Sequence, residues 1–357
     1  MGATFGRNLR LTIFGESHGK GIGMILDGLP PGTPIDEAFI KTEMARRAPG
    51  KNKMSTQRQE TDAFILESGV FEGKAAGTPL CVLIPNSDQH SKDYSILKDK
   101  MRPGHADYAG KMKYRGFNDY RGGGHFSGRL TAPLVFAGAV AKTLLRQKGI
   151  AIGAHIARIG RVTDVMFDPL GEPEARLNAL RAQTLPVLDE SRAPLMEAEI
   201  MAAREQQDSV GGVVEVMATG LPPGIGDPFF DSLESRLAHA LFSVPAVKGL
   251  EFGTGFGMAA MKGSEANDPM RFEAGRVVTT SNHNGGITGG ITNGMPILFR
   301  VAIKPTPSIS RPQQTVDLAA GSDTVLEIKG RHDPCIVPRA VPVIEAVTAW
   351  ILQDMMM

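Results

Sequence analysis

Three histidines lie in short segments rich in glycine and proline, and these segments are the first candidates for a catalytic site. They read Gly-Glu-Ser-His-Gly at 15–19, Arg-Pro-Gly-His-Ala-Asp at 102–107 and Gly-Arg-His-Asp-Pro-Cys at 330–335. Glycine and proline favour turns, and ordered loops often carry functional groups. Since imidazole ordinarily titrates near neutral pH, His18 and His105 are candidate general acids or bases, although a single histidine is more often structural. Asp333 would either orient a base or cap a turn.

Arginine and lysine form local clusters. They are Arg46, Arg47, Lys51, Lys53 and Arg58, then Arg102, Arg115, Arg121 and Arg129, then Arg331 and Arg339. Arginine binds carboxylates and phosphates through paired hydrogen bonds, so a site that gathers these clusters would suit a small substrate with several anionic groups. The alternative is that Arg46 and Arg47 merely complement the negative end of a helix dipole.

Two glycine-rich runs could bring the backbone close to a ligand. They are Arg-Gly-Gly-Gly-His-Phe-Ser-Gly-Arg at 121–129 and Asn-His-Asn-Gly-Gly-Ile-Thr-Gly-Gly at 282–290. Without a Cβ atom in the way, their amides can approach a phosphate or a flat ring, although such glycines also serve tight packing alone. A third run, at 253–257, lacks the spacing and the following helix of a dinucleotide-binding fingerprint. A serine hydrolase is not expected, because Ser17 lies outside a Gly-x-Ser-x-Gly elbow.

The composition indicates a globular protein of enzyme size. The chain has 357 residues, of which 42% are hydrophobic and 22% charged, and it can bury a large core in one large or two medium domains. Its formal net charge of +1 provides no long-range attraction for nucleic acid or for an anionic membrane. Neither a signal peptide nor a spanning helix is evident, because Lys142 interrupts the longest apolar stretch. Cys81 and Cys335 form no disulfide or metal-ligand pattern, which suits a cytoplasmic protein without a bound metal.

The sequence predicts a layered α+β core. Strands are expected at 80–84, 213–217 and 297–303, and helices at 132–147, 194–207 and 342–352. Because helices do not follow each strand regularly, the sheets should be antiparallel. The turn Gly-Leu-Pro-Pro-Gly occurs at 28–32 and again at 220–224, each time between an apolar run and a helix-like segment. We therefore expect one domain, 1–357, with two related halves at about 1–190 and 191–357.

Taken together, the motifs make the chain resemble the chorismate synthase family over nearly its whole length. They are Phe-Gly-Glu-Ser-His-Gly (14–19), Asp-Gly-Leu-Pro-Pro-Gly (27–32), Arg-Pro-Gly-His-Ala-Asp-Tyr (102–108), Asp-Tyr-Arg-Gly-Gly-Gly (119–124), Pro-Ala-Val-Lys-Gly (245–249), Lys-Pro-Thr-Pro-Ser-Ile (304–309), and Gly-Arg-His-Asp-Pro-Cys with Arg-Ala-Val-Pro (330–342). The resemblance implies a layer of helices between two antiparallel sheets, an internal pseudo-two-fold repeat and a homotetramer. It also implies a lyase of the shikimate pathway, which converts 5-enolpyruvylshikimate 3-phosphate to chorismate and phosphate by a 1,4-anti elimination.

The same resemblance assigns roles to individual residues. His18 would protonate or stabilise the leaving phosphate, His105 would keep the reduced flavin in the right protonation state, and Asp333 would assist proton removal. The anionic groups of the substrate would be held by Arg47, Lys53, Arg102, Ser127 and Arg129. Flavin contacts would come from His125, Phe126, Ser127, Pro245, Ala246, Gly289, Lys304, Pro305, Thr306, Pro307, Ser308 and Arg331. The cofactor would be reduced FMN, with NADPH only as an indirect source of reducing equivalents and an external flavin reductase as the candidate partner.

Several positions depart from the family pattern. His125 and Phe126 stand where most relatives have arginine and serine, and Ala48 and Lys53 each replace an expected arginine. Lysine lacks the planar fork of arginine, so Lys53 should hold a carboxylate less firmly. The alternatives are an NADPH-dependent flavoprotein oxidoreductase and a non-catalytic binder of phosphorylated metabolites. Phosphate release without stoichiometric NADPH consumption would separate all three functions.

Overall fold

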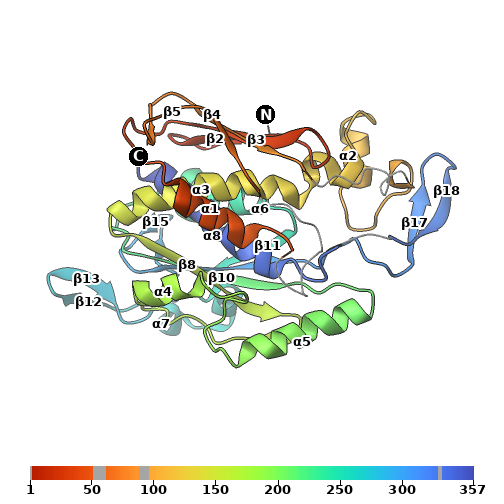
Figure 1. Ribbon diagram of the computed structural model, residues 1–357. Helices are drawn as coiled ribbons and strands as arrows, with labels where there is room; N and C mark the ends of the chain where they lie inside the picture. Colours follow the sequence, from red (N-terminus) through yellow and green to blue (C-terminus); the bar gives the residue numbers. More distant parts are fainter. Residues whose placement is uncertain (1, 51–61, 88–95, 329–331) are drawn as a thin grey trace.

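The computed structural model describes residues 2–50, 62–87, 96–328 and 332–357 of the chain. Figure 1 shows a sheet, a central group of helices and a second sheet, one above the other. Each of the two sheets has five strands, and all neighbouring strands within them are antiparallel. The predicted α+β class with antiparallel sheets is therefore confirmed.

The first sheet is built from the N-terminal part of the chain. Its strands, in spatial order, are β1 (Thr4–Phe5), β2 (Arg10–Gly15), β3 (Gly21–Asp27), β7 (Leu80–Pro85) and β4 (Ile65–Ser68). In β7, the buried residues Leu80, Val82 and Ile84 alternate with more exposed ones, as expected of a strand with one face on the core. The strand predicted at 80–84 is therefore confirmed.

The second sheet contains longer strands. In spatial order they are β11 (Val247–Phe252), β16 (Ile297–Ile303), β10 (Gly212–Thr219), β8 (Ala151–Ile159) and β9 (Val162–Thr163). Strands β10 and β16 confirm the predictions at 213–217 and 297–303. Because β8 and β9 belong to this sheet, the chain passes from the first sheet to the second between Pro85 and Ala151, before the expected division near residue 190.

In the part of the chain that the structure describes, four helices separate the two sheets (Figure 1). They are α1 (Glu37–Arg47), α3 (Thr131–Gln147), α6 (Leu233–Phe242) and α8 (Val337–Met355). Helix α3 contacts β3 on one side and β8 on the other, and α8 contacts α3, β8 and β10. Side chains of Asp36 and Ser232 accept hydrogen bonds from backbone amides and so cap the starts of α1 and α6.

The predicted boundaries are correct for α3 and wrong for the start of α8. The structure begins α8 at Val337, although the sequence predicted a start at Pro342. Proline is well tolerated in a first turn, and Pro338 occupies that place. Pro342 lies inside the helix, where its missing N–H leaves one intrahelical hydrogen bond unmade.

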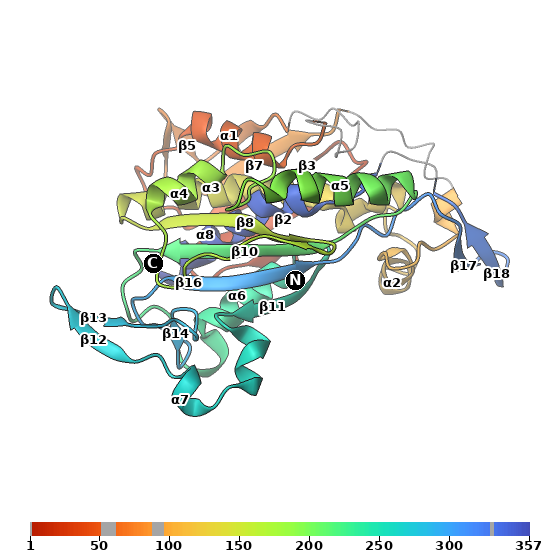
Figure 2. The same ribbon diagram turned by 90° about the horizontal axis from the view of Figure 1, so that it is seen from below.

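The remaining elements lie around this core. Helices α4 (Glu174–Leu180) and α5 (Arg192–Glu205) lie along the side of the second sheet formed by β8 and β9, and α5 confirms the helix predicted at 194–207 (Figure 2). The others are α2 (Asp107–Lys113), α7 (Gly263–Ala266), the 3-10 helices η2 (Arg121–Phe126), η3 (Gly128–Leu130), η4 (Phe229–Asp231) and η5 (Gly255–Ala260), and the strand pairs β5 (Val70–Phe71) with β6 (Lys74–Ala75), β12 (Met270–Glu273) with β13 (Arg276–Thr279), β14 (Ile287–Thr288) with β15 (Ile291–Thr292), and β17 (Gln313–Asp317) with β18 (Ser322–Leu326). The β12–β13 and β17–β18 hairpins project from opposite sides of the molecule (Figure 1).

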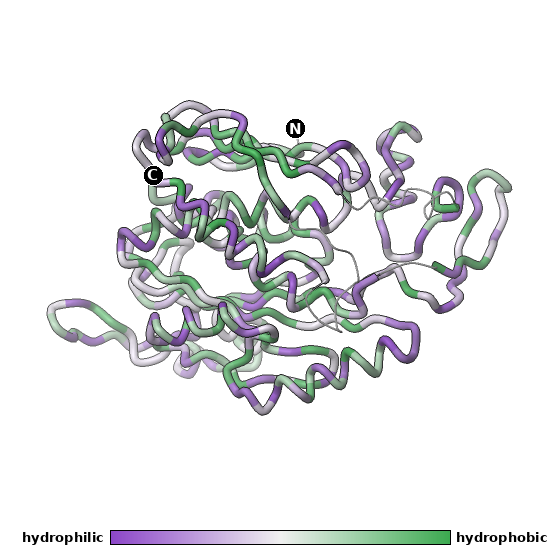
Figure 3. Tube along the Cα trace, viewed as in Figure 1, coloured by the Kyte–Doolittle hydropathy of each residue, from purple (hydrophilic) through white to green (hydrophobic). Residues whose placement is uncertain are grey.

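Hydrophobic residues follow the layers of the fold. In Figure 3 the strands of the first sheet are mainly hydrophobic, whereas α5 carries many hydrophilic residues. Helix α8 has most of its length buried, including Ile344, Val347 and Ile351. Within the described ranges, no helix combines the length and the apolar character needed to cross a membrane.

Candidate active site

Two of the candidate histidines pack against one short glycine segment. In η2, Gly122 and Gly123 have φ angles of 58° and 83°, which L side chains rarely adopt. A Cβ atom on Gly122 would lie 2.0 Å from His18 Nδ1, and one on Gly123 would lie 3.1 Å from His105 Cε1. The absence of side chains at these two positions therefore allows both imidazole rings to lie directly against the backbone of η2.

The loop between β2 and β3 carries His18 and is held on two sides. The amide of Ser17 donates a hydrogen bond to the Gly124 carbonyl at 3.1 Å. Asn86, just after β7, donates through Nδ2 to two carbonyl groups that flank His18, each at 3.0 Å. His18 is 3% exposed. The first sheet and the glycine segment together fix its position.

An ionised carboxylate lies near His18. Arg121 donates to Asp119 through Nε at 2.9 Å and through Nη2 at 2.8 Å. The pKa of Asp119 lies below its ordinary value, mainly because of these hydrogen bonds, and the charge of His18 lowers it further. The negative charge of Asp119 therefore favours a positive charge on the nearby His18 side chain.

Asp107, the first residue of α2, holds Arg102 and His105 together. Its carboxylate accepts hydrogen bonds from Arg102 Nε at 2.7 Å and from Arg102 Nη2 at 2.8 Å, and it contacts His105 Nδ1 at 2.7 Å. Burial raises the pKa of Asp107, but the hydrogen bonds from Arg102 and His105 outweigh burial and hold the pKa far below its ordinary value. The ionised carboxylate thus fixes the imidazole through Nδ1, while the Nε2 edge faces Gly123.

The segment 304–308 lies beside the His105 loop. Arg102 Nη1 donates to Ser308 Oγ at 3.1 Å, and Lys304 Nζ donates to the Gly104 carbonyl. The amide of Lys304 also donates to the Ala246 carbonyl at 2.9 Å. Ala246 has a φ of 75°, which is unusual for a residue with a side chain. The structure therefore brings the predicted flavin residues around 246 and 304–308 next to Arg102.

A second group of charged side chains centres on Asp62, which sequence analysis did not single out. Asp62 accepts hydrogen bonds from Arg47 Nε at 2.9 Å, from Arg47 Nη2 and from Arg129 Nη1. Arg129 Nε donates to Asn86 Oδ1 at 3.1 Å, which connects this group to the His18 loop. Burial raises the pKa of Asp62, but the two guanidinium groups lower it below its ordinary value. The sequence gives only one indication of this role, namely that Asp62 follows the cationic residues between Arg46 and Arg58.

Asp333 is linked to the same group through α8. Arg339 Nη1 donates to Asp333, and Arg339 Nε donates to the Arg47 carbonyl at 2.9 Å. The side chain of Arg339 therefore bridges the candidate base, Asp333, and the candidate substrate-binding residue, Arg47. Burial raises the pKa of the nearby Cys335 thiol to about 12, so this cysteine stays protonated and is no nucleophile at neutral pH.

The side chains of residues 125–127 contact other parts of the protein. His125 Nδ1 contacts the Gly15 carbonyl at 2.9 Å. The ring of Phe126 covers Gly110 of α2, where a Cβ atom would lie 2.6 Å from Cε2. The Ser127 hydroxyl accepts a backbone amide at 3.3 Å and so caps η3. His125 and Phe126, two of the positions that depart from the family pattern, thus pack against the first sheet and α2.

Two predicted residues, Lys53 and Arg331, lie outside the described residues. A third, Gly289, is described but lies apart from these groups. Gly289 lies between β14 and β15, and the following residue, Gly290, accepts a hydrogen bond from the start of α6 at 2.9 Å. This is the opposite end of β16 from segment 304–308, and seven strand residues at ~3.3 Å each separate the two ends by roughly 20 Å.

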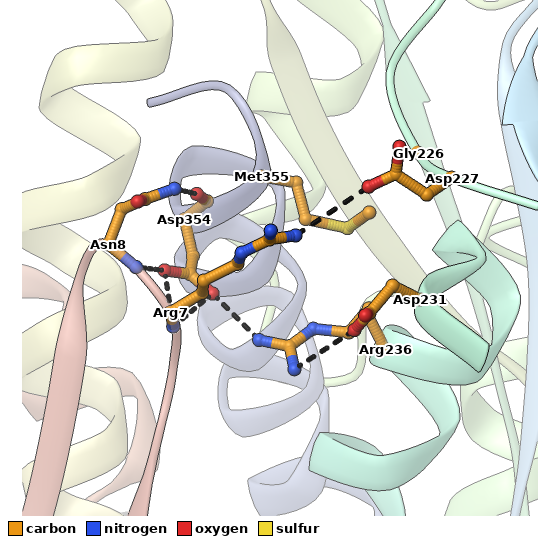
Figure 4. A pocket seen from close by; sticks show the side chains of 8 residues that line it. All are labelled: Arg7, Asn8, Gly226, Asp227, Asp231, Arg236, Asp354 and Met355. Atoms are coloured by element: carbon orange, nitrogen blue, oxygen red, sulfur yellow. Dashed lines mark hydrogen bonds and ion pairs between the residues drawn. The ribbon is translucent and has the colours of Figure 1, made fainter.

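A cavity of about 240 Å³ lies elsewhere, between the N-terminal loop, α6 and the end of α8 (Figure 4). It is lined by Arg7, Asn8, Gly226, Asp227, Asp231, Arg236, Asp354 and Met355. Asp354 accepts hydrogen bonds from the amides of Arg7 and Asn8 at 2.9 and 2.7 Å and from Arg236 Nη2 at 3.0 Å. These bonds tie the start of the chain to α8, and none of the lining residues belongs to the predicted site.

Comparison with known proteins agrees with the motifs and with the geometry. The family model described as chorismate synthase matches residues 9–357. The chorismate synthase of Methanocella arvoryzae is 49% identical over 355 residues, which cover 99% of this chain and 94% of that protein. That of Pyrococcus abyssi is 49% identical over 350 residues, covering 98% and 96%. A crystal structure of chorismate synthase superposes with a TM-score of 0.78 at 32% identity and covers 98% of this chain and 92% of that one. The chain therefore belongs to the chorismate synthase family.

Proposed function

We propose that the His18, His105 and Asp62 groups form one active site for the family's reaction, the elimination of phosphate from 5-enolpyruvylshikimate 3-phosphate to give chorismate. The packing of both histidines against one glycine segment is the observation that carries this proposal. An acid for the leaving phosphate and a group beside the cofactor must act on one bound substrate, so they have to lie close together. The reaction belongs to the carbon–oxygen lyases.

Three arginines are proposed to bind the anionic groups of the substrate, which carries two carboxylates and a phosphate. Arg47, Arg102 and Arg129 are all buried, so solvent and salt screen their charges less than those of surface arginines. Asp62 and Asp107 hold the guanidinium groups in fixed orientations, which lowers the entropy lost on binding. The same role for Lys53, and a flavin contact for Arg331, rest on the family resemblance.

The residues around Ala246 and Thr306 fit the reduced FMN that the family implies. The Thr306 hydroxyl is buried and has no hydrogen-bond partner among the described residues, so a polar ligand atom could satisfy it. Ser209 Oγ donates to the Thr306 carbonyl at 2.7 Å and steadies this segment. When bound, the reduced flavin would supply electron density that helps the phosphate to leave and would take up the hydrogen lost from carbon.

The protein side chains are proposed to manage the protons. His18, held against Gly122, would protonate the departing phosphate. His105 would hold a proton at the cofactor, because Asp107 fixes its Nδ1 and leaves the Nε2 edge on the other side. Asp333, oriented by Arg339, would assist removal of the proton from carbon.

Gly289 is proposed to contact the flavin of a neighbouring subunit. Its place at the far end of β16 separates it from segment 304–308 of its own chain, and the homotetramer expected from the resemblance would supply the neighbour. If so, mixing an inactive His105→Ala protein with an inactive Gly289→Trp protein should restore part of the activity, because hybrid oligomers would contain some intact sites. Without restoration, Gly289 would be assigned to its own subunit.

Cytoplasmic location and dependence on an external flavin reductase are also proposed. Cys81 and Cys335 are both free thiols, which suits a reducing compartment. The glycine run at 253–257 leads into the short helix η5, whereas a dinucleotide fold requires a full helix there. The protein would then receive its reduced flavin from a separate enzyme, and NADPH would act only through that enzyme.

The two sheets are proposed to be related halves of one domain. The order β2-β3-β7-β4 in the first sheet corresponds to β8-β10-β16-β11 in the second, with α1 and α3 matching α6 and α8 along the chain. The repeated Gly-Leu-Pro-Pro-Gly turn follows the central strand of each sheet, at 28–32 and 220–224. This correspondence favours a division near residue 150.

An anaerobic assay tests the function directly. With substrate and reduced FMN, the protein should release chorismate and phosphate in equal amounts without consuming NADPH, whereas oxidised FMN should support no turnover. An oxidoreductase would consume NADPH stoichiometrically, and a simple binder would release no phosphate. His18→Ala and His105→Ala should each lower kcat by roughly 10² or more, the usual scale for loss of a general acid or base.

A further inference from the structure

Four buried charges join α1, α3 and α8 next to the proposed substrate site. Lys142 Nζ of α3 contacts Glu43 Oε2 of α1 at 2.5 Å and Glu345 Oε2 of α8 at 2.6 Å. Arg46 donates to Glu345 through Nη1 at 2.7 Å and through Nη2 at 2.9 Å. The side chains of Glu43, Lys142 and Glu345 are at most 2% exposed.

The four-charge cluster consists of Glu43, Arg46, Lys142 and Glu345. It fixes the relative position of the three helices more than it adds to the free energy of unfolding. Burial raises the pKa of Glu345, but Arg46 and Lys142 outweigh burial and hold the pKa below its ordinary value. Ions are costly to bury, and packed apolar residues of similar volume often give equal or greater stability. Each charge in the cluster has a partner on another helix, so all four are satisfied only when α1, α3 and α8 keep one relative position.

The end of α1 that enters this cluster also carries the substrate arginine. Arg46 contacts the cluster, whereas the next residue, Arg47, contacts Asp62 together with Arg129. Helix α8 holds this end of α1 a second time, because Arg339 Nε donates to the Arg47 carbonyl at 2.9 Å. Two residues of α8 therefore hold the backbone around Arg47: Glu345 through the Arg46 side chain, and Arg339 through the Arg47 carbonyl.

We propose that Glu345, with Arg46 and Lys142, is a positioning element for substrate binding. By fixing the end of α1, it directs the Arg47 guanidinium toward an anionic group of the substrate. Glu345 does not touch the substrate and acts through Arg47. The inference rests on the proposed role of Arg47 in substrate binding.

The test compares Glu345→Gln with a matched core variant in steady-state assays with reduced FMN. Glutamine keeps the shape of Glu345 and removes its charge, so KM for 5-enolpyruvylshikimate 3-phosphate should rise about tenfold while kcat changes less than about threefold. Val347→Ala, also in α8 and fully buried, should lower the thermal unfolding temperature and leave KM unchanged. Should Glu345→Gln fail to fold, Arg46→Met breaks the same link from a side chain that is 12% exposed.

A double-mutant cycle shows whether the effect passes through Arg47. In an Arg47→Ala background, adding Glu345→Gln should raise KM no further. Equal rises of KM in Glu345→Gln and Val347→Ala would overturn the proposal, as would full additivity in the Arg47→Ala background. An Arg47→Ala variant with an unchanged KM would also overturn it, while chorismate formation by the same variant would leave the proposed reaction intact.

Discussion

Replacing Asp107 by asparagine should weaken both the fold and catalysis. The carboxylate is 5% exposed and holds the Arg102 guanidinium by two hydrogen bonds and His105 by a third contact. Removing one member of a buried charge pair costs about 3–5 kcal/mol, and asparagine keeps one acceptor oxygen, so we expect a loss of about 3 kcal/mol in the free energy of unfolding. Because His105 also loses its orienting partner, kcat should fall by roughly 10².

Guanidinium chloride unfolding and the anaerobic chorismate assay measure the two effects separately. Asp99→Asn is the matched control, because Asp99 pairs with Lys111 of the same helix α2 at 3.1 Å, with side chains that are 36% and 28% exposed. Such a partly exposed pair contributes about 0–1 kcal/mol, so the control should be nearly as stable and as active as the wild type. If Asp107→Asn unfolds at the same denaturant concentration as Asp99→Asn, the reasoning about the buried carboxylate is refuted.

A methyl group on Gly122 should displace His18, because the new Cβ would lie 2.0 Å from Nδ1, so Gly122→Ala should lower kcat by roughly 10². Gly116→Ala, with a φ of 80° but open space around it, controls for backbone strain, and equal kcat values in the two variants would contradict the contact. Burial lowers the pKa of His155, but its hydrogen bonds to two carboxylates outweigh burial and raise the pKa above its ordinary value. The resulting stabilisation is complete below the ordinary histidine pKa and is lost as pH rises through the folded pKa. As pH rises above the ordinary histidine pKa, the free energy of unfolding should therefore fall more steeply for the wild type than for His155→Gln; equal slopes would remove His155 as the cause. Finally, NADPH with oxidised FMN and no other reductant should give no steady turnover, and continuous loss of NADPH absorbance with chorismate formation would reveal a built-in flavin reductase.

Local sequence was enough to predict the family, the reaction and most secondary structure. Each motif combines a reactive side chain with glycine or proline, and the conformational limits of those residues act within a few positions. Strand β16 and helix α3 were predictable because each is a mainly apolar run that is buried over most of its length, and the run in α3 is too long for a typical strand. The start of α8 was not, because a proline inside a helix reads as a boundary when its tertiary packing is unknown.

The contacts that make the proposed site were decided by the tertiary structure. Gly122 lies against His18, Asp62 joins two arginines from different segments, and Lys142 meets a carboxylate 203 residues away in the chain. Nothing local distinguishes these charged residues from solvated ones, since their pairing follows from how the helices pack between the sheets. The sequence alone thus determined which chemical groups are present and which reaction they serve. Only the fold decided which carboxylate holds each cation, because partners distant in sequence are chosen by the geometry of the packed layers.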